Sequence, residues 1–113
     1  MEEKYTRLIK ILMAYKVEIK TALREKDLTD VDKTYYADII EALNEVTRYQ
    51  VQNRHRPKSE LYELSINYIM KEEKFARTVI TSLVSLENHH KYLARYTAYN
   101  ELIERIIKWE MHF

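Results

Sequence analysis

The chain has 113 residues, a length that fits a single domain over residues 1–113 with one modest core. Hydrophobic residues make up 46% of it and charged residues 33%, a balance typical of a folded protein rather than a disordered one. Lys and Arg number 19 and Asp and Glu 18, and this net charge of +1 lacks the basic excess of a dedicated non-specific DNA-binding protein.

The composition predicts an all-α fold. Glycine is absent and proline occurs once, whereas sheets and tight hairpins usually need glycine at their turns. The lack of cysteine excludes disulfides, thiolate metal sites and cysteine nucleophiles. No apolar run reaches the ~18 residues of a membrane span, and the charged start Met1-Glu2-Glu3-Lys4 differs from a signal peptide. We therefore expect a cytoplasmic protein, of a cell or an infected host, that does not bind a membrane.

A first amphipathic helix is expected over residues 2–26. Its apolar residues recur every three or four positions and so share one face: Tyr5, Leu8, Ile9, Leu12, Tyr15, Ile19 and Leu23. Thr29 is a good N-cap for the next helix, and Asp32 stands three residues later, where a carboxylate favours a helix N-terminus.

A second helix is expected over residues 30–52, with an apolar face that includes Ile39, Leu43 and Val46. It should stop before residues 53–57, because Pro57 cannot continue a helix and disfavours the α conformation at the preceding residue. Proline suits the first turn of a new helix, so the third helix should begin there.

Residues 58–113 contain neither glycine nor proline, but one helix of roughly 84 Å, at ~1.5 Å per residue, is too long for so small a domain. We expect a turn near residues 85–89, capped by Ser85 or Asn88, and consider a kink at residues 70–72. The uncharged segment 78–86 should be helical, since a lone strand has no partner, and it should be the most buried element. The result is a small up-and-down bundle of four or five amphipathic helices.

The connector between the second and third helices is a candidate anion site. From residue 46 to residue 59 it carries cations and no acid, and these residues form the candidate set: Arg48, Arg54, His55, Arg56 and Lys58. A helix N-terminus favours anions, and arginine binds phosphate through two hydrogen bonds. The set predicts binding of DNA, RNA or an acidic partner. The alternative is a solvated loop whose arginines pair with Glu60 or Glu63.

Arg48 and His55 are separated by six residues. This spacing resembles the Arg-x(4–6)-His signature of the HEPN ribonucleases. The resemblance covers eight residues and implies an Arg–His pair placed against a scissile phosphate, with His55 as general acid or base. A HEPN-like ribonuclease is therefore a third hypothesis for the function.

Aromatic residues on the last helix form a candidate interface. Three of the ten tyrosines share one helical face, and a tryptophan lies further along; the set is Tyr92, Tyr96, Tyr99 and Trp109. Tyrosine and tryptophan are enriched at protein interfaces, although the same face could equally be the core side of the helix. Long helices in a short chain also tend to leave apolar surface exposed, so we expect a homodimer.

No motif predicts a cofactor, a metal or a small-molecule substrate. Glu87 and His90 have the spacing of one di-iron motif, but the second motif that such sites need is missing. We therefore expect a non-enzymatic interaction or adaptor protein that docks a helical surface onto a macromolecular partner. Small helical proteins of this kind are common among phage and archaeal-virus accessory proteins. Nucleic-acid binding by the connector is the alternative.

Overall fold

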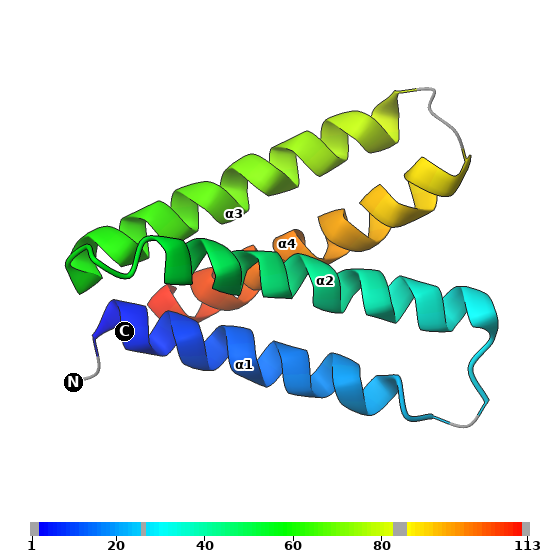
Figure 1. Ribbon diagram of the computed structural model, residues 1–113, viewed down its shortest axis with the longest axis horizontal. Helices are drawn as coiled ribbons and strands as arrows, with labels where there is room; N and C mark the ends of the chain where they lie inside the picture. Colours follow the sequence, from blue (N-terminus) through cyan, green and yellow to red (C-terminus); the bar gives the residue numbers. More distant parts are fainter. Residues whose placement is uncertain (1–2, 26, 83–85, 112–113) are drawn as a thin grey trace.

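The computed structural model describes residues 3–25, 27–82 and 86–111, and this part of the chain forms four helices and no strand. In chain order they are α1 (Lys4–Ala22), α2 (Asp30–Gln52), α3 (Lys58–Thr81) and α4 (Leu86–Met111). Successive helices run in opposite directions, with α1 and α2 lying along one another and α4 behind them (Figure 1). The expected all-α class and the count of four helices are confirmed.

Local capping chemistry sets the beginning of α2. The Thr29 side chain accepts a hydrogen bond from the backbone N–H of Asp32, and the Asp32 carboxylate accepts one from the backbone N–H of Thr29. This reciprocal pair satisfies two N–H groups that a helix start otherwise leaves unpaired. The bounds of α2 agree with the expectation. In contrast, α1 ends at Ala22, four residues earlier than expected, in a turn in which the Glu25 N–H donates to the Ala22 carbonyl.

The helices α3 and α4 divide the long uninterrupted segment. Pro57 is the N-cap of α3, as its restricted backbone predicts, and α3 continues through Met70 without a break. The expected turn was placed too late, because α4 already begins at Leu86. Asn88 lies inside α4 and is therefore not its cap. Ser85, the other expected cap, lies outside the described residues.

The core is centred on α4, which packs most extensively against α3 and then α2. Two alanines one turn apart, Ala94 and Ala98, have no exposed surface, and their small side chains let the neighbouring helices approach closely. Tyr99 and Leu102 follow in the same buried stripe. The partners from the other helices are also buried: Leu8, Leu12, Tyr15, Ile39, Ala42, Leu43, Val46, Tyr62 and Ile69.

Polar groups inside the bundle are paired across helices. The Glu45 carboxylate of α2 accepts hydrogen bonds from the Arg95 guanidinium and, at 3.3 Å, from the Tyr99 hydroxyl of α4. The buried Gln50 side chain donates to the Ser65 hydroxyl of α3 at 3.3 Å. Because a buried polar group without a partner destabilises the fold, these contacts favour one particular arrangement of α2 against its neighbours.

The expectation that residues 78–86 form the most buried element is wrong for its described part. Thr78, Thr81 and Ser82 are exposed, and Val79 and Ile80 are only half-buried. The physical reason is position along the helix, since this end of α3 diverges from α2 toward the turn before α4 (Figure 1). The side chains of residues 83–86 lie outside the described part.

None of the helices in the described part of the chain combines the length and the apolar character that crossing a bilayer requires.

Candidate functional site

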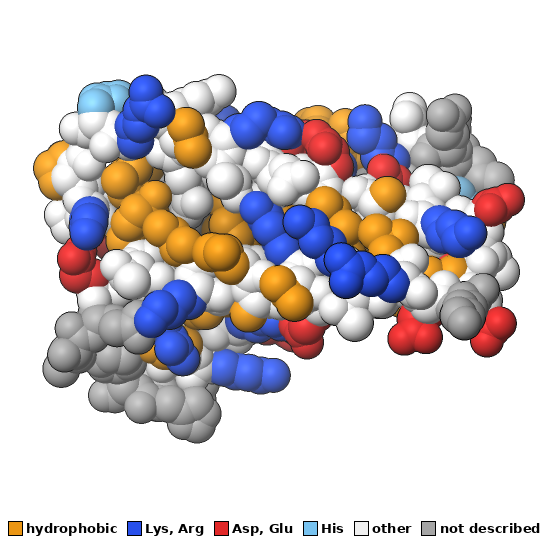
Figure 2. Space-filling model, turned by 60° about the horizontal axis from the view of Figure 1, so that its bottom comes forward, with side chains coloured by type: hydrophobic (Ala, Val, Ile, Leu, Met, Phe, Trp, Pro, Cys, Tyr) orange, Lys and Arg blue, Asp and Glu red, His pale blue; other side chains and the backbone are white. Residues whose placement is uncertain are grey.

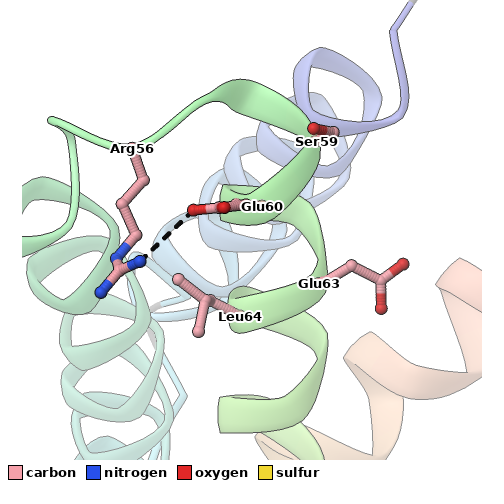
Figure 3. Close-up of a pocket in the computed structure, with 5 residues that line it drawn as sticks. All are labelled: Arg56, Ser59, Glu60, Glu63 and Leu64. Atoms are coloured by element: carbon pink, nitrogen blue, oxygen red, sulfur yellow. Dashed lines mark hydrogen bonds and ion pairs between the residues drawn. The ribbon is translucent and has the colours of Figure 1, made fainter.

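The basic connector lies at one end of the bundle, between α2 and α3. Figure 3 shows Arg56 reaching from the connector toward Glu60 on the first turn of α3, with Leu64 one turn further along. A shallow pocket of about 370 Å³ lies beside these side chains, and its lining residues are Arg56, Ser59, Glu60, Glu63 and Leu64. The pocket is therefore lined by two carboxylates and one cation, which makes it a poor receptor for an anion.

Three of the four connector cations pair with carboxylates of the same chain. The Arg56 guanidinium lies 3.3 Å from Glu60, and the Lys58 ammonium lies 3.4 Å from Glu3. Arg48, on α2, donates to Glu41 at 2.7 Å, a hydrogen bond that raises the pKa of its guanidinium above the usual value. All of these cations are exposed. Most of the positive charge of the connector is thus paired with carboxylates of the same chain.

Arg54 and His55 differ from their neighbours. Both side chains are exposed in the turn that follows α2, and within the described residues neither takes part in an ion pair. The structure therefore brings the five predicted residues to one end of the bundle, and within the described residues only these two are outside any ion pair. Arg48 and His55, the HEPN-like pair, lie on either side of the end of α2, and Arg48 is held by Glu41.

The aromatic set on α4 divides between the core and the surface. Tyr99 has no exposed surface, so its ring packs within the protein's own core. Tyr92 and Tyr96 are half-buried, and Tyr92 contacts the exposed Phe75 ring edge-on with 5.8 Å between centroids. Trp109 is half-buried and packs against the core. Within the set, Tyr99 is thus a core residue, whereas Tyr92, Tyr96 and Trp109 keep part of their surface open to solvent.

A second surface, which the charge pattern of the sequence did not single out, lies between α1 and α2. The Lys16 ammonium of α1 donates to the Thr47 hydroxyl of α2 at 2.6 Å. Burial lowers the pKa of Lys16, and the nearby positive charge of Lys20 lowers it further. No ion pair within the described residues engages either lysine. The positive charge on this surface is therefore not neutralised locally.

Exposed apolar side chains accompany these lysines. Met13 and Val17 of α1 are 59% and 62% exposed, and Val51 of α2 is 51% exposed. Because the Lys16–Thr47 contact fixes the register of two antiparallel helices, Met13 and Val51 each lie one turn from it at the same level of the bundle. We call this surface the α1–α2 seam and define it by Met13, Lys16, Val17, Lys20, Thr47 and Val51. Arg54 follows in the turn just after α2.

Acidic residues are directed away from the seam. Glu18 is the one carboxylate within α1, and it pairs with Arg105 of α4. On α2, Glu45 meets Arg95 of α4 and Glu41 meets Arg48. Figure 2 shows the face to which α1 belongs, where a row of Lys and Arg side chains crosses an apolar surface and most Asp and Glu side chains lie near the edges. The seam is thus both apolar and positive.

Two further hollows have a different character. The larger, of about 750 Å³, lies between the beginnings of α2 and α4 and is lined in part by Asp30, Asp32 and Asp38, facing Lys91. The smaller, of about 360 Å³, lies between α3 and α4 and includes Met70 and several isoleucines. Within the described residues, no group of three or more His, Asp or Glu side chains could hold a metal ion.

Compared with protein-family models, with curated proteins and with solved structures, the chain gives no match.

Proposed function

We propose that this protein is a non-enzymatic interaction protein, which docks a helical surface onto another macromolecule through the α1–α2 seam. The observation that carries the proposal is the exposure of Met13, Val17 and Val51 beside Lys16 and Lys20. Three large apolar side chains, each more than half exposed, lose contact with water only when a partner covers them. The lysines around them favour a partner that is negatively charged.

The test is capture of a binding partner by immobilised protein from an extract of the cells in which it is made. The wild-type chain is compared with Met13→Ser/Val17→Ser, whose changes are on the surface and should leave folding intact. The control is Met70→Ser, a methionine of similar exposure on α3. We expect the wild type and the control to retain the same protein and the seam variant to lose it. Retention of nothing by the wild type, or equal retention by all three, would contradict the proposal.

Nucleic-acid binding by the connector is the second candidate, supported by Arg54 and His55, which are exposed and take part in no ion pair within the described part of the chain. The ion pairs of Arg48, Arg56 and Lys58 do not prevent it, because an exposed pair contributes only about 0–1 kcal/mol and can exchange its carboxylate for a phosphate. Electrophoretic shifts with DNA and RNA, measured at several salt concentrations, test it. If the Arg54→Ala/Arg56→Ala variant binds as strongly as the wild type, the connector is excluded as the nucleic-acid-binding site.

A further inference from the structure

We infer that the α1–α2 seam receives an acidic amphipathic helix of a partner protein, laid along the two helices with its apolar residues on Met13, Val17 and Val51. This inference rests on the proposed function and specifies the partner. The seam consists of two antiparallel helices side by side (Figure 1), and the exposed side chains of two such helices can pack against the side-chain ridge of a third. Partner recognition by an amphipathic helix uses apolar anchors at three- and four-residue spacing.

The apolar side chains distinguish this partner from a nucleic acid. Met13 and Val51 lie at the same level of the bundle, each one turn from the Lys16–Thr47 contact, and Val17 follows one turn along α1. A nucleic acid would place its charged phosphate backbone against these three apolar side chains, which is unfavourable. A leucine or isoleucine of a partner helix would instead remove them from water. A bilayer is also disfavoured, because helices that lie in a membrane surface carry Trp, Phe or Leu on the buried face and the seam has none.

The charges distinguish the partner from a second copy of this chain. In a twofold dimer through the seam the same patch is present on both subunits, so the positive charge of Lys16 and Lys20 would be doubled within one interface. Within the described residues neither lysine takes part in an ion pair that would offset the resulting repulsion. A homodimer, if the chain forms one, should therefore use another surface. Glutamates or aspartates on the partner helix would instead meet Lys20 at one end of the seam and Arg54 at the other.

The experiment measures fluorescence anisotropy with a labelled peptide of about 18 residues, roughly 27 Å long as a helix, with leucines on one face and glutamates beside them. A peptide of the same composition in scrambled order keeps the charge but removes the apolar face. A labelled oligothymidylate of about 20 nucleotides tests the nucleic-acid alternative. The protein variants are Met13→Ser/Lys20→Glu in the seam and Met70→Ser/Lys71→Glu as a matched pair on α3, where both residues are exposed.

We expect the wild type and the α3 variant to bind the amphipathic peptide with the same Kd. The seam variant should bind it at least about tenfold more weakly, because it loses an apolar contact and reverses a charge. The scrambled peptide should bind weakly to all three. Equal weakening in both variants would place the peptide elsewhere, and equal binding of the scrambled peptide would show that charge alone is recognised; either result overturns the inference.

The remaining outcomes separate the inference from the proposed function. Tighter binding of the oligothymidylate, lost in Met13→Ser/Lys20→Glu, would assign the seam to nucleic acid and overturn the helix inference while leaving docking in place. No binding of any probe would also overturn the inference. The proposed function is then decided independently by the capture experiment.

Discussion

The carboxylate of Glu45 provides the sharpest test of how α2 and α4 are held together. It accepts hydrogen bonds from Arg95 and from the Tyr99 hydroxyl, and Arg48 lies 3.9 Å away. The Arg95 side chain is 12% exposed and that of Glu45 25%. Removing one partner of a fully buried ion pair costs about 3–5 kcal/mol. Because Glu45 is partly hydrated and keeps two neighbours, we expect Arg95→Met to lower the free energy of unfolding by about 2 kcal/mol.

The assay is urea denaturation followed by circular dichroism for wild type, Arg95→Met, Glu45→Leu and the double variant. In the double variant no carboxylate remains without its partner, so it should be more stable than the sum of the single losses implies, by about 1–2 kcal/mol. Arg56→Met is the control, since its pair with Glu60 is exposed, and it should change stability by less than about 0.5 kcal/mol. Additive losses, or an Arg95→Met protein as stable as wild type, would refute this account.

The remaining predictions concern the helix cap, the ionisation of a buried phenol and the core. Thr29→Ala removes the capping box and should lower the free energy of unfolding by about 1 kcal/mol in urea denaturation, whereas the exposed Thr34→Ala should not. Burial, together with Glu101, raises the pKa of Tyr15 from 10.0 to about 12. The unfolded chain therefore loses this proton first, and the stabilisation, complete below pH 10, is lost as the pH rises toward 12. Between pH 7 and pH 11 the Tyr15→Phe variant should therefore lose less stability than the wild type, as measured by urea midpoints at the two pH values. Equal losses in both proteins would show that ionisation of Tyr15 does not contribute. Leu102→Ala leaves a cavity at the centre of the bundle and should cost about 3 kcal/mol, against less than about 1 kcal/mol for the partly exposed Leu93→Ala, by the same denaturation assay.

Local signals in the sequence predicted the helix boundaries where such signals exist. Thr29 with Asp32 marks the start of α2, and Pro57 marks the start of α3, because each acts through its own backbone neighbours. The end of α1 carries no such signal. Arg24 and Glu25 are good helix formers, and the chain nevertheless turns after Ala22 so that α2 can return along α1. Tertiary packing decides that boundary.

Helical periodicity predicts the angle of a residue around the axis but not the place where the helix is covered. Tyr92 and Tyr99 are two turns apart on one face of α4, yet Tyr99 is fully buried and Tyr92 is only half-buried. The difference arises because Tyr99 lies at the level where α2 and α3 both pack on α4, near Glu45 and Tyr68. Thr78 shows the same limit, since a segment without charge is exposed where its helix diverges from the bundle.

The distribution of charge could not be obtained from the sequence because the ion pairs join distant positions. Glu3 reaches Lys58 across 55 residues and Glu18 pairs with Arg105, so a run of cations along the chain need not be a positive surface. Lys16 and Lys20, by contrast, are spaced along α1 among apolar residues and form no run of charge in the sequence, yet both belong to the seam. A nearly neutral chain must carry the matching acids elsewhere, and Asp30 and Asp32 lie at the beginning of α2, at the opposite end from Arg54. This separation of charge along α2 should orient an approaching acidic partner before the apolar contacts of the seam are made.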